Sequence, residues 1–152
     1  MLHRSLLEKL STLERPDPDL NVAIYAACQG FQYEQTEDQK YRFFQGGLWI
    51  KPGEQWPNSG QFTLYPIPDY TGQWNDALTV IPYPWRLSRV WEAERLGMAP
   101  FWSIKIKGNL SLREGGLYTA EKHLTLSAGS FRLVTAGICF VGLQARTLNH
   151  PY

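Results

Sequence analysis

Three basic side chains on two neighbouring strand-like segments are the first candidates for chemistry in this sequence. Lys105 and Lys107 alternate with Ile104 and Ile106, and Arg86 lies in the segment before them. Cations beside Trp and Tyr rings can hold a phosphate-bearing ligand or single-stranded nucleic acid, because bases stack on the rings. The alternative is an ordinary charged face that nearby carboxylates neutralise, and the net charge of only +1 favours it. The neutralising residues would be Glu92, Glu94 and Glu121.

Arg89 follows a different pattern from the other basic residues. It shares the strand alternation of Leu87 and Trp91, so we expect its side chain to be partly buried. A buried guanidinium needs a carboxylate or a ligand anion beside it.

His123 is the only histidine inside a predicted element. Glu121 lies two residues away on the same strand face, so the two side chains could form an acid/base pair. A solvated row of polar side chains is the favoured interpretation, because such rows need no function. No nucleophile elbow, phosphate-binding glycine loop or HExxH motif is present. We therefore expect no catalytic residues, no metal and no cofactor.

Aromatic side chains gather in the stretch from residue 31 to residue 68, which Gly and Pro residues interrupt repeatedly. The stretch is either a recognition surface or a satellite hydrophobic cluster under a long excursion, and the sequence favours neither. Its candidate partner-binding residues are Trp49, Trp56 and Tyr65, which we group with Arg86, Lys105 and Lys107. We predict that Trp49 or Trp56 is exposed in the isolated chain, or is covered only by a second copy.

Hydrophobic periodicity predicts the helices. Leucines from 2 to 13 give an amphipathic helix that ends before Pro16, and a second helix runs from the caps Asp17 or Asp19 to Gly30. A third helix follows residues 69–71, with Thr71 as its cap and a buried stripe that contains Trp74, Ala77, Leu78 and Ile81. A nearly all-apolar helix from 130 to 147 begins at the cap Ser130, and Ile138 and Val141 should be inaccessible in it.

Alternating polar and apolar residues predict strands at 85–94, 101–107 and 117–126, with turns at 108–109 and 115–116. Shorter strands are predicted at 41–44, 48–51 and 61–65. Half-polar strands indicate an antiparallel sheet with one solvated face. We therefore predict an α+β fold, an antiparallel sheet with helices packed on it, as a single domain over residues 1–152.

Composition limits the class of protein. The chain has 152 residues, of which 43% are hydrophobic and 19% are charged, as in an ordinary folded domain. The N-terminus carries charge throughout and lacks the apolar core of a signal peptide, and the last apolar run is too short for a bilayer. Cys28 and Cys139 lie in apolar helical patterns without metal-ligand spacing, which favours free buried thiols. We expect a cytoplasmic protein that has no membrane partner.

Three segments resemble small phage and prophage proteins with the phage ABA-sandwich domain. They are LLEKLSTLERPDPDLNVAIYAA near the N-terminus, DYTGQWNDALTVIP before Trp85, and LSAGSFRLVTAGICFVGLQA in the closing helix. The resemblance covers the first 30 residues and most of the chain from 69 to 146. It implies helices packed on a central sheet and assigns no catalytic residue. This chain differs from the family in its aromatic excursion and in Gly129-Ser130-Phe131.

Together these patterns favour a phage- or prophage-encoded accessory protein that acts by binding and is not an enzyme. The expected partner is a host or phage protein or a small ligand, with counter-defence as one role and a homo-oligomer as one assembly. A nucleic-acid-binding module that uses the basic and aromatic sheet face is the alternative, ranked lower because the charge is balanced. A hydrolase built on His123 ranks last.

Overall fold

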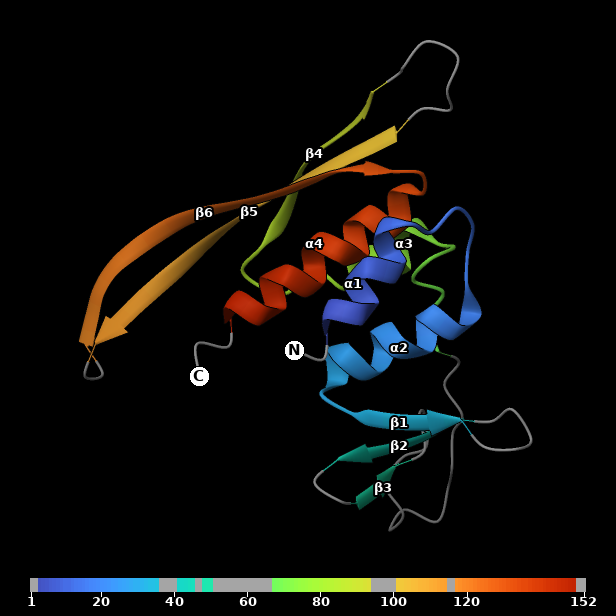
Figure 1. Ribbon diagram of the computed structural model, residues 1–152. Helices are drawn as coiled ribbons and strands as arrows, with labels where there is room; N and C mark the ends of the chain where they lie inside the picture. Colours follow the sequence, from blue (N-terminus) through green and yellow to red (C-terminus); the bar gives the residue numbers. More distant parts are fainter. Residues whose placement is uncertain are drawn as a thin grey trace.

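The computed structural model describes residues 3–35, 41–45, 48–50, 67–93, 101–114 and 117–149. Figure 1 shows an α+β fold in which helices pack on an antiparallel sheet, and this confirms the predicted fold class. The elements are, in chain order, α1 (His3–Ser11), α2 (Pro18–Gln29), β1 (Gln32–Gln35), β2 (Tyr41–Gln45), β3 (Leu48–Ile50), α3 (Trp74–Leu78), β4 (Arg86–Ala93), β5 (Phe101–Glu114), β6 (Leu117–Phe131) and α4 (Val134–Asn149).

Helix α4 is the centre of the structure. It packs against β5 and β6 on one side and contacts α1, α2 and α3 on the other (Figure 1). Ile138 and Val141 have no accessible surface, which confirms the prediction that they are inaccessible. A helix that is apolar on nearly every side is stable only when other elements cover it in this way.

Two glycines let neighbouring elements approach α4 closely. A side chain at Gly137 would overlap Ile104 of β5 and Phe131 of β6. A Cβ atom at Gly142 would lie 2.9 Å from the backbone carbonyl carbon of Val80, beyond the end of α3. Their absent side chains therefore set the spacing on both sides of α4.

The large sheet has the strand order β4-β5-β6, and both pairs are antiparallel. Ile104 and Ile106 face α4 and are fully buried. The turn expected at 108–109 is wrong, because β5 continues through both residues. Gly108 instead allows a close approach, since a Cβ atom there would lie 2.6 Å from the buried ring of Trp85.

The predicted start of the closing helix is also wrong. Ser130 belongs to β6, and α4 begins at Val134. Trp102 pairs with Phe131 while Ile104 pairs with Ala128, so β6 contains one extra residue in a bulge. Ser130 has φ 69° there, a left-handed conformation that is uncommon for a residue with a side chain.

The ends of α2 agree with the prediction. The Asp17 side chain accepts hydrogen bonds from the amides of Asp19 and Leu20, and Gly30 closes the helix with φ 73°. The guanidinium of Arg146 on α4 donates to the carbonyl oxygens of Val80, Thr79 and Cys28, at 2.8, 3.2 and 3.4 Å. These bonds connect the ends of α2 and α3 to α4.

Thr71 does not cap α3. The N-cap is Gln73, which makes no side-chain capping bond, and the Thr71 hydroxyl contacts α2 instead. The predicted stripe is wrong at Trp74, which is 41% exposed, because α3 has only five residues. Ala77 and Val80 supply the buried contacts of this segment.

The second sheet has the order β1-β2-β3 and lies against α2 (Figure 1). Phe43 of β2 is fully buried there and packs with Val22 and Ala26 of α2. At this position the satellite-cluster interpretation of the aromatic stretch is confirmed. β1 was not predicted, and the strand predicted at 61–65 lies outside the described residues.

Candidate functional site

The sheet β4-β5-β6 has one face that the described helices do not cover. All of these helices lie on the other side, where α4 contacts β5 and β6 (Figure 1). We call the uncovered side the open face. It consists of the side chains that alternate with the buried ones: Arg86, Arg89, Trp91, Ser103, Lys105, Lys107, Asn109, His123, Thr125 and Ser127.

Four cations lie in two directly opposed pairs at the centre of the open face. Arg86 on β4 is the cross-strand partner of Lys107 on β5, and Arg89 is the partner of Lys105. Three of the side chains are exposed and Lys105 is half-buried. Like charges directly opposite each other destabilise a sheet, so the arrangement is unfavourable without an anion.

The predicted partial burial of Arg89 is wrong, because its side chain is exposed. The pairing shifts between Leu87 and Arg89, where β4 contains one extra residue, Ser88. This bulge moves Arg89 and Trp91 to the open face while Leu87 stays on the core side. Alternation alone could not reveal this, since nothing in the residue types marks a bulge.

Arg89 and Trp91 form a cation–π pair on the open face. The guanidinium carbon of Arg89 lies 4.7 Å from the centroid of the Trp91 ring. Trp91 is half-buried and lies opposite Ser103 on β5. The bulge therefore adds an aromatic ring and a fourth cation to the three basic residues that the sequence singled out.

Of the three glutamates expected to neutralise these cations, the one whose side chain is described, Glu92, forms no ion pair with them. Glu92 pairs with Trp102 across the strands and therefore lies on the core-facing side, not on the open face. Glu94 and the side chain of Glu121 lie outside the described residues. The ion pairs described are Arg4–Glu8 and Arg132–Glu14, both elsewhere.

His123 lies at the far end of the open face. Its Nδ1 atom lies 2.6 Å from the Oδ1 atom of Asn109, its cross-strand partner. An amide oxygen only accepts, so Nδ1 is the donor in this hydrogen bond. The acid/base pair with Glu121 stays a prediction, because the Glu121 side chain is not described.

The aromatic candidates outside this sheet are less well defined. Trp49 lies in β3 opposite Phe44, but its side chain lies outside the described part of the chain. Trp56 and Tyr65 lie outside it altogether. The structure therefore brings Arg86, Lys105 and Lys107 together, and the prediction about Trp49 and Trp56 stays a prediction.

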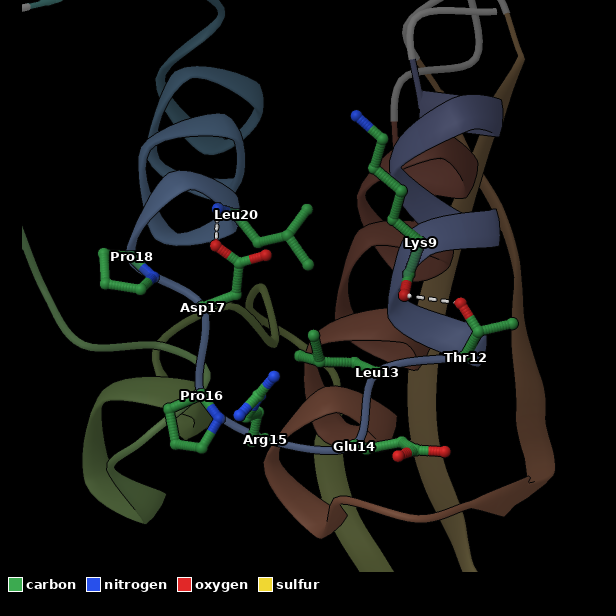
Figure 2. A pocket seen from close by; sticks show the side chains of 9 residues that line it. All are labelled: Lys9, Thr12, Leu13, Glu14, Arg15, Pro16, Asp17, Pro18 and Leu20. Atoms are coloured by element: carbon green, nitrogen blue, oxygen red, sulfur yellow. Dashed lines mark hydrogen bonds between the residues drawn. The ribbon is translucent and has the colours of Figure 1, made fainter. Parts of the chain in front are cut away.

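A second candidate is a hollow of about 380 Å³ between the end of α1 and the start of α2. Figure 2 shows Leu13, Arg15 and Asp17 on the connecting segment that borders it. The volume suits a small ligand. However, both carboxylates of the hollow already serve the fold, since Asp17 caps α2 and Glu14 pairs with Arg132 at 3.2 Å.

No group of three or more His, Cys, Asp or Glu side chains among the described residues could hold a metal ion. Within the same residues, no helix is both long and apolar enough to cross a bilayer.

No protein-family model matches this chain, and no curated protein or solved structure is significantly similar to it. The resemblance to the phage ABA-sandwich family therefore stays a prediction from the three segments that suggested it.

Proposed function

We propose that this protein acts by binding a negatively charged partner on the open face of the β4-β5-β6 sheet, and that it catalyses no reaction. The observation that carries the proposal is the double pairing Arg86–Lys107 and Arg89–Lys105. Each pair of like charges costs the sheet a few tenths of a kcal/mol up to about 1 kcal/mol. A bound anion converts that cost into attraction.

The positions of the charged residues support this proposal, whereas the net charge alone does not. Fifteen basic and fourteen acidic residues give a net charge of only +1. Four of the basic residues share one sheet face, and none of these four forms an ion pair with another described residue. Local potential, and not net charge, governs the approach of an anionic partner.

The resemblance to phage ABA-sandwich proteins suggests the biological context in which this binding takes place. We propose an accessory protein of a phage or prophage that works in the host cytoplasm, with counter-defence as its role. An acidic surface of a host or phage protein would satisfy the open face, and so would the phosphates of a nucleic acid.

The proposal is tested by chromatography on immobilised heparin, a polyanion that serves as the probe. The site variant is Lys105→Gln with Lys107→Gln. The control variant is Lys9→Gln with Arg15→Gln, which makes the same change in charge on exposed residues of the helical side. We expect the site variant to elute at clearly lower salt than the wild type, and the control to elute near it.

Melting temperature and circular dichroism establish that both variants are folded. Equal elution of the two variants would contradict the proposal, because retention would then reflect total charge and not the open face.

A further inference from the structure

We propose that the anionic partner is a single strand of nucleic acid, with the cations contacting its phosphates and the Arg89–Trp91 pair stacking on a base. This inference rests on the proposed function and specifies the partner. It follows from three features of the open face: the spacing of its cations, its aromatic pair and its neutral donors.

The cations are spaced for a repeating anion. Lys105 and Lys107 are two residues apart on β5, which separates them by about 6.7 Å along the strand. This spacing is comparable to the distance between successive phosphates of an extended single strand. On β4, Arg89 lies beside Lys105 and Arg86 lies beside Lys107. The face therefore has two rows of cations that run along the same strand direction.

The aromatic pair provides a platform that a charge patch alone lacks. The Arg89 guanidinium lies over the ring of Trp91, 4.7 Å from its centroid. Unpaired bases stack on indole rings and on guanidinium planes alike. The bases of a duplex are already stacked on one another, so the platform selects single strands.

Neutral hydrogen-bonding groups extend the surface along the third strand. Ser127 lies opposite Lys105, and Thr125 lies opposite Lys107. Both are exposed, and hydroxyl groups commonly contact phosphates and sugars. From Ser103 to Asn109 the face spans about 20 Å, which is room for about three nucleotides.

The competing partner is an acidic protein surface, which would contact a different set of residues on the open face. It would use the four cations, but it would gain no base stacking on the aromatic pair. The role of Trp91 therefore separates the two partners.

Fluorescence anisotropy with a labelled oligothymidylate of about 12 nucleotides measures the binding. We expect Trp91→Ala to weaken it roughly tenfold, and Trp91→Phe to retain most of it. The matched control is Trp74→Ala, because Trp74 is a partly exposed tryptophan on α3, away from the open face. This control should bind like the wild type.

Salt dependence gives an independent measurement. Contacts with about three phosphates, the number for which the face has room, predict a slope of about −2 in log affinity against log salt. Raising salt fourfold should then weaken binding roughly twentyfold. The Lys105→Gln/Lys107→Gln variant should lower the slope by between one and two units.

The same titrations with duplex DNA and with polyglutamate decide the outcome. Equal or tighter binding of the duplex, or no effect of Trp91→Ala on the single strand, would overturn this inference. Polyglutamate binding that depends on Lys105 and Lys107 but not on Trp91 would leave the proposed function standing and identify an acidic protein as the partner. Loss of lysine dependence for every polyanion would overturn both.

Discussion

At the scale of single residues, a buried polar cluster fixes the segment before α3 to α2. Asn21 accepts hydrogen bonds from the amide and the hydroxyl of Thr71, at 2.9 and 2.8 Å. Its own amide donates to Asp69 at 2.9 Å, and the Thr71 hydroxyl accepts from the Asp17 amide at 2.9 Å. These hydrogen bonds hold the segment 69–71 against α2, although Thr71 caps no helix.

Thr71→Val keeps the shape of this side chain but removes its hydroxyl. We expect the free energy of unfolding to fall by about 1–3 kcal/mol, because the Asp17 amide loses its buried partner. Thr12→Val is the control, since Thr12 is exposed and should change stability by less than about 0.5 kcal/mol. Urea unfolding measures both, and equal stabilities of the two variants would contradict the importance of the cluster.

The two cysteines are free in the structure, as the sequence predicted. Cys139 is fully buried and Cys28 is half-buried. Burial raises the pKa of the Cys28 thiol, and the charge of Arg146 partly opposes this. We expect mass spectrometry after alkylation in denaturant without reductant to find two modified cysteines. In the native protein Cys28 should react before Cys139, and one intramolecular disulfide would contradict this prediction.

At the scale of elements, the periodicity of the sequence predicts which side chains of a strand or helix face the core. It does not predict features that depend on how one element pairs with its neighbour. The alternation of residue types correctly placed Lys105 and Lys107 on the other face of β5 from the buried Ile104 and Ile106. Helical periodicity likewise placed α4 in the core. The bulge at Ser88 depends on the pairing of β4 with β5, so alternation within one strand could not predict it. The same holds for the glycine at 108, whose close contact with Trp85 arises only in the folded sheet.

The central position of α4 leads to a prediction about two residues of that helix. Ile138→Asp buries an unpaired charge in the apolar core around α4, so we expect a loss of about 4 kcal/mol or more. Leu148→Asp is the control, because Leu148 is 47% exposed on the same helix and should cost less than about 1 kcal/mol. A melting temperature of Ile138→Asp within about 2 °C of the wild type would contradict the core assignment.

At the scale of the whole molecule, the two faces of the large sheet have opposite properties. The inner face joins α4 and the other helices in one apolar core, and the open face collects cations and hydroxyl groups. Net charge therefore describes this protein poorly, because four of its cations gather on one face of the sheet. Such clustering could not be predicted from composition, since it depends on which residues each strand turns outward.

The buried ionisable groups of the core predict how stability of the whole molecule depends on pH. Burial raises the pKa of the Cys139 thiol above its ordinary value of 9.0, and Cys28 nearby raises it further. Burial likewise raises the pKa of Tyr70 above 10.0, with smaller increases from Cys28, Tyr25 and Cys139 and an opposing effect of Arg146. Both groups are neutral in the folded protein at pH values where the unfolded chain already loses their protons.

The folded state therefore binds more protons than the unfolded state above about pH 9, and stability falls as pH rises. We expect full stability below pH 9 and a loss of up to about 1.4 kcal/mol per pH unit from Cys139 above it. Cys139→Ala should be less stable than the wild type at pH 7, yet lose less stability between pH 8.5 and 10. Tyr70→Phe should follow the wild type in that range and differ only above pH 10, where its ring would otherwise ionise in the unfolded chain. Urea unfolding at several pH values measures the slopes, and a Cys139→Ala slope equal to that of the wild type would show that this thiol does not control alkaline stability.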